Sequence, residues 1–232
     1  MSDDAAQVAR TMHAYDEMAT EFANRTWDLQ LDEIRRDFLT ALETGRPGAS
    51  LRILDAGCGP GRDVAWFLKQ GHIAIGGDLS AGMLEEARRR VPDAPFVRMD
   101  LREPSFRPRA FDAVWLCASM LHMPKDDWLP TLRRYHSLLN GGRIFVSVKE
   151  GTGDRPGTDQ GAAYQRRFFS YTTESELRVL LEVAGFRVLT LRRSPGEPEH
   201  DWLQAHGEAQ ERSVNLAGDL PDLGWASTHA RS

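Results

Sequence analysis

The sequence predicts an α/β fold in which helices cover both faces of a mostly parallel sheet. Between residues 51 and 193, short apolar runs alternate with segments of helical periodicity. Strands that alternate with helices in this way form parallel sheets through right-handed crossovers. A chain of 232 residues is long enough for one such domain with a sizeable core.

Two helices are expected before this region, within residues 3–44. Each is predicted by apolar residues that recur at helical spacing. The first apolar face consists of Val8, Met12, Tyr15, Ala19 and Phe22, and the second consists of Leu31, Ile34, Phe38 and Leu42. Gly45 and Pro47 are expected to stop the second helix.

Six strands and four helices are expected in the alternating region. The strands are predicted at 51–56, 72–78, 95–100, 111–118, 142–148 and 186–193, and the helices at 62–70, 81–91, 126–139 and 172–186. The last helix starts with the capping-box pair Thr173 and Glu176, and Gly185 is expected to end it. Residues 196–232 are polar, and within them only 201–205 has strand character.

Composition narrows the class of protein. Hydrophobic residues make up 41% of the chain, and no apolar run approaches the ~20 residues that cross a bilayer. The stretch "MSDDAAQVAR" does not resemble a secretory signal, and Cys58 and Cys117 form neither a metal-ligand pair nor a disulfide framework. We therefore expect a cytoplasmic protein with no metal and no membrane partner. The net charge of −5 argues against a nucleic-acid partner.

The stretch "LDAGCGPGRD" predicts a ligand site in the first strand-to-helix turn. Its glycines, Gly57, Gly59 and Gly61, allow positive φ and let a ligand lie against bare backbone. Asp78 ends the second predicted strand, where a carboxylate can accept hydrogen bonds from a ribose diol. Asp100 ends the third. Together these positions predict a ligand that contains a nucleoside.

The spacing of the turn indicates which nucleoside. A dinucleotide site has G-x-G-x-x-G and faces a pyrophosphate, whereas this turn reads G-x-G-x-G. Asp55 precedes the turn, and its carboxylate would repel a pyrophosphate but attract an ammonium group. S-adenosylmethionine, which joins adenosine to a sulfonium and an amino acid, fits this pattern.

Residues 50–150 resemble the class I S-adenosylmethionine-dependent methyltransferases, in their small-molecule branch. The resemblance is carried by "ILDAGCGPGRD", "GGDLSAGMLEEAR", "VRMDLRE", "FDAVWLCASMLHMP" and "LLNGGRIFVSV", in that order. It implies a Rossmann-like α/β/α sandwich with a helical cap and a seven-stranded sheet of order 3-2-1-4-5-7-6, the last strand antiparallel. "HDWLQAHGEAQERS" departs from the family pattern as a poor final strand.

The resemblance also implies which residues bind the cofactor. Asp55 and Gly57 would hold the methionine end, and the next two glycines would shape the turn. Asp78 would bind the ribose. Asp100 would accept from the adenine amino group, with capping of the next segment as its alternative role. Tyr15 would close over the cofactor, with core packing as its alternative. The full implied set is Tyr15, Asp55, Gly57, Gly59, Gly61, Asp78, Leu79, Met83, Asp100, Leu101 and Cys117.

The molecule that accepts the methyl group is expected to contact segments other than those that bind the cofactor. The chain is divided into a helical lid (1–45), a cofactor-binding core (46–206) and a polar tail (207–232), with a substrate-side loop at 149–171. In that loop Arg166 and Arg167 are candidates to hold a carboxylate or phosphate. The alternative is a solvated loop whose Phe168 and Phe169 pack on the core.

His122 is the candidate general base. It follows the fourth predicted strand, and an imidazole can take a proton from an attacking hydroxyl near neutral pH. The alternative is that His122 caps the following helix or shapes the pocket.

The function expected is transfer of a methyl group from S-adenosylmethionine to an oxygen or nitrogen atom of a small molecule. An RNA or protein methyltransferase is the first alternative, favoured if the arginine pairs 133–134, 166–167 and 192–193 form one basic face. A nicotinamide-dependent oxidoreductase and a non-catalytic nucleoside-binding protein are the others.

Overall fold

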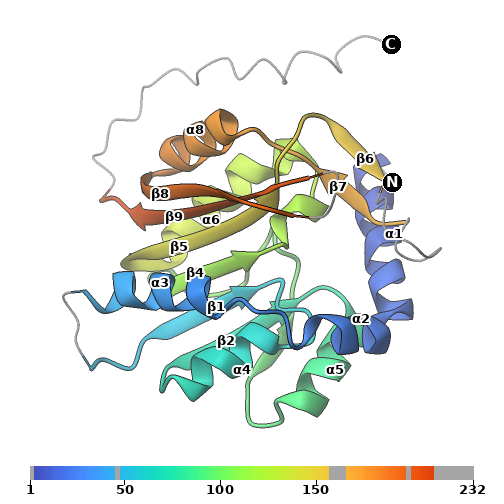
Figure 1. Ribbon diagram of the computed structural model, residues 1–232, viewed down its shortest axis with the longest axis horizontal. Coiled ribbons are helices and arrows are strands. Elements are labelled where there is room, and N and C mark those ends of the chain that lie inside the picture. The colour runs from blue at the N-terminus through green and yellow to red at the C-terminus, as the bar shows by residue number, and fades with distance from the viewer. Residues whose placement is uncertain (1–2, 45–47, 157–165, 197–199, 212–232) are drawn as a thin grey trace.

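The computed structural model describes residues 3–44, 48–156, 166–196 and 200–211 (Figure 1). Seven strands form the main sheet: β1 (Arg52–Ala56), β2 (Ile73–Asp78), β3 (Phe96–Arg98), β4 (Phe111–Cys117), β5 (Leu139–Lys149), β8 (Phe186–Ser194) and β9 (Trp202–Ala209). A separate pair consists of β6 (Asp154–Pro156) and β7 (Phe168–Ser170). The helices are α1 (Asp3–Glu17), α2 (Ala19–Thr26), α3 (Asp32–Glu43), α4 (Arg62–Lys69), α5 (Ala81–Arg90), α6 (Trp128–Leu138) and α8 (Glu174–Ala184), and two 3₁₀ turns are Met120–His122 and Lys125–Asp127.

The topology of the main sheet confirms the predicted fold class. The strand order is β3-β2-β1-β4-β5-β9-β8, which is 3-2-1-4-5-7-6 when the strands of this sheet are counted along the chain. The pairs from β3 to β5 are parallel, and β9 runs antiparallel to both β5 and β8.

The final strand corrects the expectation that "HDWLQAHGEAQERS" is a poor one. β9 runs through Ala209, beyond the expected core boundary at residue 206, and bonds to a neighbour on each side. Leu203, Ala205 and Gly207 alternate as its buried positions. Burial between two strands stabilises this segment in spite of its polar composition.

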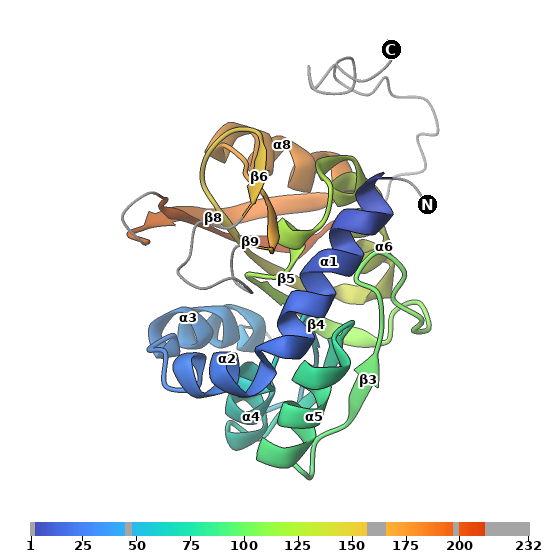
Figure 2. The same ribbon diagram turned by 90° about the vertical axis from the view of Figure 1, so that its right-hand side faces the viewer.

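Helices cover both faces of the sheet, which makes the three layers expected (Figures 1 and 2). On one face α3 and α4 pack on a core that contains Phe38, Phe67 and Trp115. On the other, α6 and α8 pack on a larger core that contains Trp128 and Tyr135.

The region expected to form two N-terminal helices forms three. The first breaks at Met18, whose φ and ψ of −104° and 11° are not helical, so that α2 changes direction and packs on α5. α1 lies across one end of the sheet (Figure 2). α3 instead packs on one face of the sheet, because its Phe38 lies in the hydrophobic core on that face. The lid expected over residues 1–45 therefore stays a prediction, now limited to α1 and α2.

Local capping follows the sequence closely at α8. Thr173 and Glu176 form both hydrogen bonds of the capping box, and Gly185 ends α8 in the left-handed conformation with a φ of 105°. The helix expected at 126–139 starts at Trp128 instead, because the preceding residues form 3₁₀ turns. In the described ranges no helix is long and apolar enough to cross a membrane.

Candidate functional site

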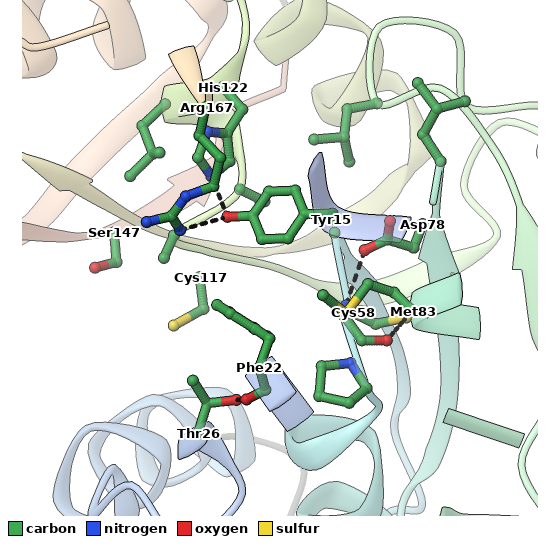
Figure 3. Close-up of a pocket in the computed structure, with 18 of the residues that line it drawn as sticks. Tyr15, Phe22, Thr26, Cys58, Asp78, Met83, Cys117, His122, Ser147 and Arg167 are labelled. Atoms are coloured by element: carbon green, nitrogen blue, oxygen red, sulfur yellow. Dashed lines mark hydrogen bonds between the residues drawn. The ribbon is translucent and has the colours of Figure 1, made fainter. Parts of the chain in front are cut away.

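A cavity of about 480 Å³ lies where the parallel strands end at their carboxyl termini. Its floor is built in strand order: Gly59 follows β1, Asp78 ends β2, and Cys117 ends β4. Helices α1 and α2 contribute Tyr15 and Phe22 to its lining (Figure 3). This is the edge at which doubly wound sheets bind ligands.

The three glycines of the turn all have positive φ, at 82°, 51° and 83° for Gly57, Gly59 and Gly61. They face different surroundings. A Cβ on Gly57 would lie 2.2 Å from Ser119 Cβ, and one on Gly61 would lie 2.9 Å from Phe96. Only Gly59 has nothing within 4 Å of that position. Gly59 is therefore the glycine whose bare backbone is open to a ligand. The other two glycines leave room for side chains of the protein itself, Ser119 and Phe96.

Asp55 is buried beside the turn and is not among the residues that line the cavity. Its carboxylate is 1% exposed, and among the described residues its Oδ2 has no hydrogen-bond partner. Burial, followed by the charge of Asp63, raises the pKa of Asp55 well above its ordinary value. An unpartnered buried carboxylate is costly and calls for a donor or a cation.

Asp78 lines the cavity and also holds the turn together. Its Oδ2 accepts from the Gly59 N–H at 2.9 Å and its Oδ1 accepts from the Ser80 N–H at 2.9 Å. Burial raises the pKa of Asp78, and these backbone hydrogen bonds oppose the shift. Leu79 and Met83, which are expected beside it, line the same cavity.

Asp100 lines the cavity together with Leu101, and Arg102 occupies its carboxylate. The Arg102 Nε donates to Oδ1 at 3.0 Å and its Nη2 donates to Oδ2 at 2.7 Å. Burial would raise the pKa of Asp100, but the hydrogen bonds from Arg102 outweigh it and lower the pKa. Sequence reasoning missed Arg102, although its position two residues after Asp100 suits a local ion pair.

Sequence reasoning also missed a buried charged cluster, centred on Asp63, next to the glycine turn. Asp63 accepts from Arg62 Nη2 at 3.0 Å, from Arg35 Nε at 2.9 Å and from Trp115 Nε1 at 3.0 Å. Burial would raise the pKa of Asp63, but the two arginines lower it to about 2. The signal was available in part, because Arg62 and Asp63 directly follow Gly61.

Tyr15, His122 and Arg167 meet in one hydrogen-bonded group at the cavity wall (Figure 3). The Tyr15 hydroxyl lies 2.7 Å from His122 Nε2 and accepts from Arg167 Nη1 at 3.1 Å. His122 Nδ1 lies 2.8 Å from the carbonyl oxygen of Phe168. Because a carbonyl only accepts, Nδ1 carries the proton, and Nε2 of the neutral ring accepts from Tyr15. Both ring nitrogens of the predicted base are thus already bonded.

The two arginines predicted to bind substrate lie in different places. Arg167 is 4% exposed and lines the cavity, whereas Arg166 lies outside it and forms an ion pair with Glu17. Phe168 and Phe169 are buried, as the alternative for the loop expects, and Phe169 also lines the cavity. Most of that loop, 157–165, lies outside the described residues.

Lys149 and Cys117 complete this side of the cavity. Lys149, missed from the sequence, is 7% exposed at the end of β5. Burial, followed by the charge of Asp63, raises the pKa of Cys117 to about 12, so its thiol is protonated at neutral pH. Across the described part of the chain, no group of three or more His, Cys, Asp or Glu side chains could hold a metal ion.

The comparisons with known proteins agree with this geometry. A family model described as "Methyltransferase domain" matches residues 53–142. The chain is 33% identical over 159 residues to methyltransferase GfsG of Streptomyces halstedii, and 41% identical over 107 residues to trans-aconitate 2-methyltransferase of Enterobacter sp. strain 638. The first match covers 62% of this chain and 55% of the relative, and the second covers 45% and 41%. The chain thus spans about half the length of these curated relatives.

A solved structure extends the similarity over nearly the whole chain. The 1,6-didemethyltoxoflavin-N1-methyltransferase of Burkholderia thailandensis, solved with 1,6-didemethyltoxoflavin and S-adenosylhomocysteine, superposes with a TM-score of 0.69 at 26% identity. The match covers 91% of this chain and 92% of that one. In its sheet topology, its glycine turn and these matches, the chain is similar to the class I S-adenosylmethionine-dependent methyltransferases.

Proposed function

We propose that this protein binds S-adenosylmethionine and transfers its methyl group to a small-molecule acceptor. The observation that carries the proposal is the arrangement at the ends of β1 and β2, where Gly59 supplies bare backbone and the Asp78 carboxylate lines the cavity beside it. Asp55 is buried behind this surface, and one water molecule would link its unpartnered Oδ2 to the ammonium group of the ligand. A pyrophosphate in the same place would be repelled, which favours this cofactor over a nicotinamide dinucleotide.

The nucleoside would lie along the ends of β2 and β3. Each Asp78 oxygen accepts one backbone hydrogen bond and has capacity for another, so both could accept from a ribose diol. Leu79, Met83 and Leu101 supply apolar surface for an adenine ring. The adenine amino group would share the Asp100 carboxylate with Arg102.

A small acceptor is favoured over RNA or protein by the cavity and by the placement of the arginine pairs. About 480 Å³ is within the range of small-molecule sites. The pairs do not converge: Arg133 and Arg134 lie on α6, Arg192 bonds to Asp37, and Arg167 is inside the cavity. The heterocycle named with the Burkholderia structure supports the same class of acceptor.

The protein's own contribution would be alignment, exclusion of water and movement of one proton. S-adenosylmethionine supplies an activated methyl group, so proximity dominates the rate. For a hydroxyl or N–H nucleophile, we propose that His122 takes the proton through the Tyr15 hydroxyl, because Nε2 faces that hydroxyl rather than the open cavity. This modifies the sequence-based hypothesis of direct proton transfer to His122.

Titration calorimetry with S-adenosylmethionine, S-adenosylhomocysteine and NAD tests the proposal. Asp78→Ala should weaken S-adenosylhomocysteine binding by about 1.5–3 kcal/mol, or roughly 10- to 150-fold, because hydrogen bonds to a charged group are lost. Asp93→Ala, at an exposed acid outside the cavity, is the matched control and should leave the affinity unchanged. The melting temperature of the unliganded Asp78 variant distinguishes lost binding from a loosened turn. Tight binding of NAD with no response to the other two ligands would refute the proposal.

A further inference from the structure

The charges that line the cavity are unevenly distributed. Its described acids are Asp63, Asp78 and Asp100, which lie at or after the ends of β1, β2 and β3, where the nucleoside and methionine are proposed to bind. Two of them form ion pairs with neighbouring arginines that line the same end. At the opposite end of the cavity, the lining includes the cations Lys149, the last residue of β5, and Arg167, which directly precedes β7.

Both cations are buried and lie against the same aromatic ring. Lys149 Nζ is 4.5 Å from the centroid of the Phe169 ring, and Arg167 Cζ is 5.1 Å from it. Arg167 also lies over the Tyr15 ring at 5.4 Å, and Lys149 lies 5.9 Å from the Trp202 ring. Two cations that converge from separate elements in a place of low dielectric raise the affinity of that place for an anion.

The wall around these cations is largely aromatic. Tyr15, His122, Phe169 and Trp202 all line the cavity there, and the rings of His122 and Phe169 lie 4.8 Å apart at an angle of 51°. Flat side chains of this kind favour a planar ligand, which can stack on one ring while its edge reaches a charged group.

We infer that the methyl acceptor is a planar, conjugated molecule that carries an anionic group, and that Lys149 and Arg167 bind this group. A carboxylate, or an acidic hydroxyl or ring N–H that ionises near neutral pH, has the required chemistry. Arg167 also donates to the Tyr15 hydroxyl, so a bound anion lies next to the proposed proton path. The inference rests on the proposed function, and it assigns the acceptor's chemical class.

The test uses the full chain saturated with S-adenosylhomocysteine, so that only the acceptor end of the cavity is vacant. Ligand-detected NMR and calorimetry compare planar acids with their uncharged amides: salicylate with salicylamide, 4-hydroxybenzoate with 4-hydroxybenzamide, and 2-naphthoate with 2-naphthamide. At least one acid should bind about 10- to 100-fold more tightly than its amide, the range expected for hydrogen bonds to a charged partner. Lys149→Met and Arg167→Met should each abolish that preference.

Arg143→Met is the matched control. Arg143 lies on β5 like Lys149, its side chain is 18% exposed, and it lies outside the cavity. It should keep the preference for the acid.

Three outcomes would overturn the inference: equal binding of acids and amides, no binding of any acid, or loss of S-adenosylhomocysteine affinity in the Lys149 or Arg167 variant. The last would assign these cations to the carboxylate of the cofactor. If the wild-type chain does not bind S-adenosylhomocysteine at all, the proposed function fails rather than this inference.

Discussion

At the scale of single residues, neighbouring glycines of one turn have different reasons to be glycine. Gly57 must leave room for Ser119, whereas Gly59 faces open space. In the unliganded protein, Gly59→Ala should cost about 1–2 kcal/mol for the left-handed backbone alone. Gly57→Ala should cost about 2–5 kcal/mol, because a steric overlap adds to that strain. Urea denaturation measures both, and Ser119→Gly should restore part of the stability only in the Gly57 variant. Equal losses in the two single variants would contradict this account.

The Tyr15–His122 pair makes a second prediction at this scale. If the proton passes through the Tyr15 hydroxyl, His122→Ala and Tyr15→Phe should each lower turnover by ~10²- to 10⁴-fold, the usual scale of general base catalysis. The affinity for S-adenosylhomocysteine should change little in the His122 variant. Rates are measured with an acceptor found by screening metabolites with labelled S-adenosylmethionine. Normal turnover in Tyr15→Phe with loss in His122→Ala would indicate direct proton transfer instead.

At the scale of elements, strand β9 places a histidine in a largely apolar setting. The His206 ring packs edge-on against Phe38 at 5.7 Å and Phe145 at 5.3 Å, and burial lowers its pKa to about 4. The unfolded chain protonates this side chain near pH 6.5, whereas the folded chain holds it neutral to about pH 4. Its stabilising contribution is therefore complete above about pH 6.5 and is lost as the pH falls toward 4.

Between pH 7 and pH 5 this effect should cost the wild-type protein about 1–2 kcal/mol of unfolding free energy, allowing for partial solvent screening. Urea denaturation at both pH values gives the number. His206→Gln cannot protonate and should show a correspondingly smaller loss over the same interval. The same pH dependence in both proteins would mean that other groups account for the acid sensitivity.

At the scale of the whole molecule, helix α1 connects the two ends of the cavity. Asp16 Oδ1 accepts from Ser80 Oγ at 2.6 Å and from the Gly82 N–H at 2.9 Å, which ties α1 to the start of α5. Thr11 Oγ1 accepts from the Phe168 N–H at 3.0 Å, which ties it to β7. A ligand that fills the cavity should stabilise all of these contacts together.

Hydrogen exchange measures that coupling. S-adenosylhomocysteine should slow exchange in residues 6–26 and 166–170, while α8, on the far side of the sheet, serves as the internal control and should not change. Unchanged exchange throughout α1 and α2 would mean that these helices are fixed structure rather than a cover for the cofactor.

The sequence by itself determined the alternation of strands and helices, the α8 caps and the glycine turn, because each depends on neighbours within a few positions along the chain. Apolar runs that are buried on both faces also predict a parallel sheet without knowledge of its partners. The resemblance supplied the strand order that the structure confirms. It left the final strand in doubt, because the polar segment that forms β9 is stabilised by its pairing with β5 and β8 on either side.

Only the tertiary structure decided which polar residues meet. Arg166 and Arg167 are adjacent in sequence, yet one lies outside the cavity beside Glu17 and the other lines it beside Tyr15. Lys149 carried no local signal, since its burial results from rings that come from β7 and β9. Likewise, His122 could be predicted to lie near the sheet edge, but not that Tyr15 and Phe168 occupy its nitrogens. Contacts between elements far apart in the chain depend on packing, which no short sequence pattern encodes.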